Sequence, residues 1–187
     1  GMKKLTLTIG MFLALFIVSC EGPNGPPGPE GPPGPEGING QVFEVEGVNF
    51  NYDSPNNVYN TIIQFSDFTN FEILDSDAVL VYRFDGQIDF EDGSKKDSWG
   101  LIPQNFFLAG GTIQYVSTHT SNDVQIFIDG NFNLSNISTE FTDNQIFRVV
   151  ILPSDFAPNA KVDKANMDAV MRTLNLEEKD VQQLQLK

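Results

Sequence analysis

NQIFRVVILP, residues 144–153, is the stretch of sequence that decides the fold. Apolar side chains follow one another from Ile146 to Leu152 with a single arginine among them. Such a continuous run predicts a strand that is buried on both faces. Pro153 has no N–H to give to a ladder, so we expect the strand to end there. The rest of the chain must supply the neighbours of this strand.

Residues 41–135 show a strand-and-turn pattern, in which short runs of Phe, Val, Ile and Tyr are broken by Asn, Asp, Ser and Gly. The predicted strands cover 41–52 with a β-bulge at Gly47, then 57–65, 78–84, two strands within 99–120 joined at Ala109-Gly110-Gly111, and a hairpin over 123–135 turning at Asp129-Gly130. Fourteen of the 16 phenylalanines lie beyond residue 40, which predicts a core rich in aromatic rings. The fold class is therefore mainly β, an antiparallel β-sandwich of which a jelly roll is one form.

One helix is predicted near the C-terminus. Met167, Val170, Met171 and Leu174 recur at spacings of three and four, which favours a helix over residues 165–174 with Asp163 as its N-cap. We expect its apolar side to cover an end or a face of the sheets. Residues 177–187 fit either a second helix or a frayed end.

The first 19 residues have the pattern of a signal peptide. Met2 is interpreted as the initiator and Gly1 as a tag remnant, and Lys3 and Lys4 precede an apolar segment over residues 5–18. That segment is shorter than the roughly 20 residues that a membrane-spanning helix needs. Cleavage is expected between Ser19 and Cys20.

Residues 17–20, IVSC, resemble the lipobox of bacterial lipoproteins. The resemblance implies that Cys20, the single cysteine of the chain, becomes the lipidated N-terminus. An ordinary secretory signal with an incidental cysteine is the alternative. By resemblance to lipoprotein sorting rules, Glu21 favours the outer membrane of a bacterial envelope, and whether the head faces the periplasm or the cell surface stays open.

A tract of Gly-X-Y triplets follows the cysteine. Residues 22–42, GPNGPPGPEGPPGPEGINGQV, place glycine at every third position: Gly22, Gly25, Gly28, Gly31, Gly34, Gly37 and Gly40. Only glycine fits at the axis of three polyproline II strands, so this period is a collagen signature. Similar tracts occur in bacterial collagen-like surface proteins. We interpret residues 20–42 as a stalk and residues 43–187 as a β-rich head.

Whether the stalk forms a triple helix stays open. Its seven triplets would span about 65 Å. A trimer would place Glu30 and Glu36 in rings of three without a lysine or arginine in the tract, and like charges so close repel. A single semi-rigid polyproline II spacer is the alternative to a homotrimer.

The charge balance excludes some partners. The chain has a net charge of −14, which becomes −16 when residues 1–19 are removed with Lys3 and Lys4. Such a surface repels phosphate backbones, so nucleic-acid binding is not expected. With Cys20 acylated, the head has no thiol and no disulfide.

No catalytic constellation is evident, and we predict a protein that is not an enzyme and needs no cofactor. His119 is the single histidine and is expected at a surface or rim, and the G-x-S-x-G pattern is missing. Zinc sites want several His or Cys ligands, so no firm metal site is assigned.

Two weaker site candidates come from clusters in the sequence. Five acidic residues within 13 positions could hold a hard cation: Asp85, Asp89, Glu91, Asp92 and Asp97. We favour the alternative of a solvated hairpin that turns at Gly93. Trp99 and Tyr115 are the candidates for a ligand platform, although aromatic residues in strands pack in cores more often.

The resulting hypothesis is a membrane-anchored surface lipoprotein whose stalk presents a non-catalytic head for binding, adhesion or structure. It resembles collagen-like lipoproteins of gram-negative bacteria, and the lipobox and the triplets carry that resemblance. The alternative is a carbohydrate-binding or carbohydrate-active envelope protein. The ligand, a protein or a glycan, is not identified by the sequence.

Overall fold

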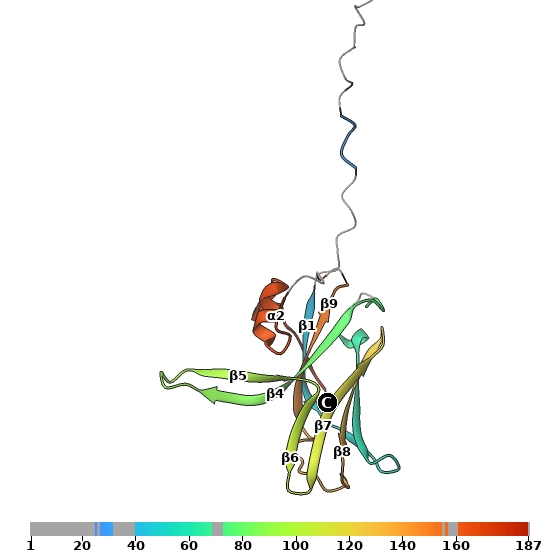
Figure 1. Ribbon diagram of the computed structural model, residues 1–187, viewed down its shortest axis with the longest axis vertical. Helices are drawn as coiled ribbons and strands as arrows, with labels where there is room; N and C mark the ends of the chain where they lie inside the picture. Colours follow the sequence, from blue (N-terminus) through green and yellow to red (C-terminus); the bar gives the residue numbers. More distant parts are fainter. Residues whose placement is uncertain are drawn as a thin grey trace, which may run out of the picture. The chain divides into compact units, whose positions relative to one another are not determined.

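The computed structural model describes residues 25, 27–31, 40–68, 73–154, 156 and 161–186. The described residues from Gly40 onward belong to one compact unit, which we call the head. Its strands make two five-stranded sheets (Figure 1), which we call sheet A, ordered β10-β1-β9-β4-β5, and sheet B, ordered β2-β3-β8-β7-β6. Their bounds are β1 Gln41–Val48, β2 Asn51–Asp53, β3 Val58–Gln64, β4 Ala78–Asp89, β5 Lys95–Leu101, β6 Gln104–Leu108, β7 Gly111–His119, β8 Asp123–Gly130, β9 Gln145–Leu152 and β10 Gln182–Gln185. The predicted β-sandwich is thus confirmed.

The main core lies between the two sheets. Sheet B contributes one side chain in two from each long strand, such as Val124, Ile126 and Ile128 of β8, all of which are fully buried. Sheet A contributes Phe43, Val149 and Phe147 from β1 and β9. The aromatic rings of this core lie edge-on or tilted to one another, an arrangement that adds to their burial.

Strand β9 is buried on both faces, as its apolar run predicts, and it ends at Leu152 before Pro153. Its second face belongs to a separate cluster on the outer side of sheet A, in which Val150 and Leu152 pack with Val42 and Tyr82. Helix α2, Met167–Thr173, closes this cluster with Met167, Val170 and Met171. The helix therefore covers a face of sheet A and not an end of the sandwich, which was the other expected position.

The bulge predicted at Gly47 is confirmed. The register between β1 and β9 shifts between Val45 and Val48, and Gly47 has a φ of +69°, which a residue with a side chain adopts at a cost. After the bulge the chain leaves sheet A and enters sheet B as β2. The predicted strand over 41–52 is therefore two strands in different sheets.

Two other predicted strand arrangements differ from the structure, although the join at Ala109-Gly110-Gly111 is confirmed, since Leu108 of β6 pairs there with Gly111 of β7. The strand expected from Trp99 onward ends at Leu101, and the chain crosses at Ile102-Pro103 from β5 in sheet A to β6 in sheet B. The hairpin at Asp129-Gly130 does not form, because Gly130 is still paired with Ile113 and does not have the positive φ that a tight two-residue turn needs. Residues 131–144 form turns instead and place Leu134 and Phe141 in the core.

The helix cap and the C-terminal tail also differ from the expectation. Asn166, rather than Asp163, caps α2, because its Oδ1 accepts the N–H of Ala169. The Asp163 carboxylate accepts the N–H of Ala165 one turn earlier. The tail forms a short 3₁₀ turn, η3, over Glu178–Asp180 and then β10, which pairs in parallel with β1.

The last predicted triplet belongs to the head. Gln41 and Val42 are the first residues of β1, and Val42 is 1% exposed under α2. Gly40 is buried, and a Cβ atom there would lie 2.6 Å from Cδ2 of Leu174. Gly25, Gly28 and Gly31 have no neighbouring atom within 4 Å of such a Cβ atom. Gly22, Gly34, Gly37, Ser19 and Cys20 lie outside the described residues.

Candidate binding surfaces

A buried polar cluster lies between the sheets around Arg83 of β4. Its Nε donates to Oε1 of Gln145 at 3.0 Å, and its Nη1 donates to Oδ1 of Asp85 at 2.6 Å. The guanidinium also lies over the rings of Tyr115 and Phe106, 4.9 and 5.2 Å from their centroids. These contacts offset the free-energy cost of removing the guanidinium from water.

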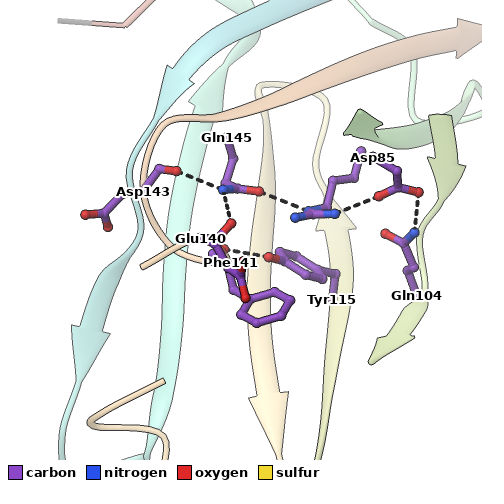
Figure 2. Close-up of polar contacts among 8 residues, drawn as sticks. Asp85, Gln104, Tyr115, Glu140, Phe141, Asp143 and Gln145 are labelled. Carbon is purple, nitrogen blue, oxygen red and sulfur yellow. Dashed lines mark hydrogen bonds and ion pairs between the residues drawn. The ribbon is translucent and has the colours of Figure 1, made fainter. Parts of the chain in front are cut away.

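Figure 2 shows how this cluster links the sheets to the turns of residues 131–144. Gln145 donates through Nε2 to the carbonyl oxygens of Glu140 and Asp143, and the Tyr115 hydroxyl donates to the Phe141 oxygen at 2.5 Å. Burial raises the pKa of Tyr115 to about 12, although Arg83 acts in the opposite direction. On the other side, Gln104 donates to Asp85 at 2.6 Å. The cluster fixes turns and strands to one another, which is a structural role.

A second charged cluster lies on the outer side of sheet A around Arg148. The Nε of Arg148 donates to Glu44 at 2.6 Å, and its two Nη atoms donate to the two oxygens of Glu178, at 2.8 and 2.6 Å. Burial alone would lower the pKa of Arg148, but the hydrogen bonds to Glu178 and Glu44 raise it. The arginine thereby ties the C-terminal tail to the sheet.

Of the two residues predicted as a ligand platform, only Trp99 reaches the surface. Trp99 is half-buried, and Arg148 lies over its ring at 4.6 Å. Tyr115 is fully buried between the sheets, so its ring is not available to a surface ligand. The sequence alone does not distinguish the two, because both are aromatic residues in predicted strands.

Trp99 borders a hollow of about 390 Å³ between helix α2 and a hairpin that we call the arm, residues 85–98. Figure 1 shows this hairpin, the distal halves of β4 and β5, extending away from the sandwich. Ile88 and Phe90 of the arm line the hollow and are 52% and 45% exposed. From the other side Asp163, Asn166 and Asp168 line it.

Four of the five carboxylates of the candidate cation site take separate partners along the arm. Asp85 pairs with Arg83, Asp89 with Lys95 at 3.4 Å, and Asp97 accepts from Gln87. Asp92 accepts from Ser94 within the turn at Gly93, and Glu91 is exposed there. Within the described part of the chain, no three His, Cys, Asp or Glu side chains gather as a metal site. The structure is that of the solvated hairpin.

The outer face of sheet B is the largest feature that the sequence reasoning did not identify. We define it by the outward side chains of its strands: Asn60, Ile62, Asn105, Phe107, Thr112, Gln114, Val116, Thr118, Gln125, Phe127 and Asp129. All are half-buried or exposed, and Phe107 is 86% exposed. The five strands of sheet B contain no lysine or arginine. Alternation in the sequence was the signal that could have found this face.

Register sets the order of side chains across this face. Asn105, Gln114 and Asp129 form one row across β6, β7 and β8, and they border a shallow hollow of about 270 Å³. The next row holds Val116 and Phe127 beside Asn60 of β3. Amide groups therefore flank apolar side chains on an open surface.

His119 is exposed at the end of β7, as expected. Among the described residues, no helix is both long and apolar enough to cross a bilayer. Comparisons with protein-family models, with curated proteins and with solved structures each found no match to this chain.

Proposed function

We propose that this protein is a lipid-anchored lipoprotein of a bacterial envelope, sorted to the outer membrane. In this proposal a Gly-X-Y spacer holds a non-catalytic β-sandwich head away from the bilayer. The observation that carries the proposal is the order of features in residues 2–40: a basic start, a short apolar segment, a cysteine after a small residue, and the glycine period. Two or three acyl chains on Cys20 hold firmly where one is marginal. A proline-rich spacer is stiff enough to keep the head at a distance.

A binding role for the head is supported by the placement of its polar groups. Four of the five carboxylates of the arm have separate partners, and Arg83 and Arg148 link parts of the fold. The head instead presents broad surfaces, the arm and the outer face of sheet B. Such surfaces suit recognition of a partner better than chemistry on a substrate.

Intact-mass spectrometry of the membrane fraction tests the anchor. We expect a chain that begins at Cys20 and carries the added mass of acyl groups, and a Cys20→Ser variant that is released from the membrane. A mature chain with an unmodified Cys20, or one that keeps residues 1–19, would contradict the proposal.

Carbohydrate binding is the second candidate function, and the outer face of sheet B favours it. Amide side chains such as Gln114 and Asn105 can donate to and accept from sugar hydroxyls, while the exposed Phe107 ring offers a surface for the apolar side of a sugar. With Asp129 on the face and no lysine or arginine in its strands, the charge disfavours an anionic polymer. The ligand class is therefore a neutral polysaccharide.

Calorimetric titration with neutral oligosaccharides, and with oligogalacturonate as an acidic comparison, tests this candidate. We expect saturable binding to a neutral sugar that falls at least about tenfold in Phe107→Ala and Gln114→Ala. Phe90→Ala on the arm is the matched control and should bind as the natural chain does. Binding that is equal in all four proteins, or stronger for the acidic sugar, would exclude this face as the site.

A further inference from the structure

Among the residues that the structure describes, the arm is a two-stranded ribbon with no strand paired to either of its edges. The ladder between β4 and β9 ends at Arg83 and Phe147, whereas the ladder between β4 and β5 continues to Asp89 and Lys95. Strand β5 is the edge strand of sheet A. Free edges of this kind pair readily with another chain, and an isolated two-stranded ribbon is marginally stable in water.

The arm, although otherwise polar and solvated, also exposes two large apolar side chains. Ile88 and Phe90 are among the five most exposed large apolar side chains of the described residues, and both border the hollow beside α2. Lys96 lies over the Phe90 ring, 5.4 Å from its centroid, so one face of the ring is partly shielded. Among the described residues, Ile88 and Phe90 nevertheless remain 52% and 45% exposed.

The glycine period identifies what can cover these two side chains. Glycine at every third position is required where three chains meet at one axis, and nothing else in the physics of a spacer requires it. Three chains joined in this way hold their heads at high local concentration. Glu30 and Glu36 oppose the triple helix by repulsion, so a second contact between the chains, in the head, would offset that repulsion.

We propose that the arm, through Ile88 and Phe90, packs against the head of a second copy of this chain in a homotrimer. The trimer closes because each copy gives one arm and receives one, a head-to-tail contact that three-fold rotation repeats. The proposal rests on the proposed function in one respect, the spacer that joins the chains. It goes further in assigning a surface of the head to the assembly.

Light scattering and native mass spectrometry test the assembly, with the chain from residue 20 onward carrying Cys20→Ser to remove acylation. The natural head sequence is compared with Ile88→Asp, Phe90→Asp and, as the matched control on the other sheet, Phe107→Asp. A Gly31→Ala variant weakens the triplet tract separately. Circular dichroism confirms that each variant is folded.

The expected result is a trimer whose dissociation midpoint rises at least about tenfold in concentration with Ile88→Asp or Phe90→Asp and is unchanged with Phe107→Asp. A monomer in the natural sequence would overturn the proposal. So would a trimer that Gly31→Ala dissociates while both arm variants leave it intact, because the tract alone would then hold the chains. The mass of Cys20 in the membrane fraction is measured independently, so loss of the anchor and loss of the arm contact are told apart.

Discussion

Strands β9 and β8 occupy equivalent central positions in the two sheets, yet their outer faces have opposite fates. The outer side chains of β9 are buried under α2 and the tail, and its burial is nearly continuous from Gln145 to Leu152. The outer side chains of β8, such as Gln125 and Phe127, are half-buried, and burial alternates along the strand. The outer face of sheet A is covered by other parts of the chain, whereas the outer face of sheet B is exposed to solvent.

The difference in burial between the two outer faces follows from the composition of the strands. QIFRVVIL of β9 is apolar at nearly every position, whereas DVQIFIDG of β8 alternates. The one charge in β9, Arg148, is neutralised by Glu44 and Glu178 beneath the helix. The strands that form the open face of sheet B contain no lysine or arginine, so this face has no buried cation that needs a partner.

The largest expected effect comes from the same substitution on the two outer faces. Val150→Asp places an unpaired carboxylate under α2 and should lower the free energy of unfolding by about 4 kcal/mol or more. Val116→Asp on sheet B should lower it by at most about 1 kcal/mol, because the carboxylate stays in water. Urea denaturation measures both, and equal losses would show that sheet B is also covered.

The next effect concerns the arginine under the helix. Arg148→Met leaves the buried carboxylate of Glu44 without a partner and should cost about 3 kcal/mol. Adding Glu44→Gln should recover part of that loss because the buried charge is gone. A double variant as unstable as the single one would mean that Arg148 contributes through packing alone.

A smaller effect distinguishes the two candidate caps of α2. Asn166→Ala should cost about 1 kcal/mol, since the N–H of Ala169 loses its acceptor. Asp163→Ala should cost less, because Asp163 lies in the turn before the helix. Thermal melts followed by circular dichroism compare them, and the reverse order would restore Asp163 as the cap.

The smallest effect is a pH dependence of the tail. The hydrogen bond from Arg148, and then its charge, hold the pKa of Glu178 below the usual 4.5, although burial acts the other way. A carboxyl group with a lowered pKa in the folded state stabilises fully above its unfolded pKa, and that contribution is lost as the pH falls through the folded value. Glu178→Gln should therefore flatten the loss of stability below pH 4.5 slightly, relative to Glu177→Gln. No difference between the two variants would remove the tail from the acid response.

Much of the fold could be predicted because local patterns agree with the tertiary structure. The run over residues 146–152, the bulge at Gly47 and the helix periodicity from Met167 each depend on neighbours in the chain. The crossing at Ile102-Pro103 could not be predicted, since only the sheet on either side shows that the strand changes layer. The parallel strand β10 is short and rich in glutamine, and it is fixed by pairing with β1 rather than by its own propensity.

The candidate surfaces were predicted less well, for a physical reason. An arginine inside a sandwich, such as Arg83, is accepted only because residues far apart in the sequence meet it, among them Tyr115 and Gln145. Trp99 and Tyr115 are both aromatic residues of predicted strands, but Tyr115 is fully buried and Trp99 is half-buried. Their burial likewise depends on residues far away in the sequence. The open face of sheet B depends on which sheet the C-terminal helix covers.

The height of the head above a bilayer tests the central claim most directly. Because Gly40 belongs to the head, the proposed spacer comprises the six triplets of residues 22–39, which would span about 55 Å in the polyproline II conformation. Neutron reflectometry of the acylated protein on a supported bilayer should resolve a head layer several tens of ångströms from the lipid, and deleting residues 22–39 should bring it to the surface. A head layer that touches the bilayer with the spacer present, at the same height as in the deletion variant, would contradict the account.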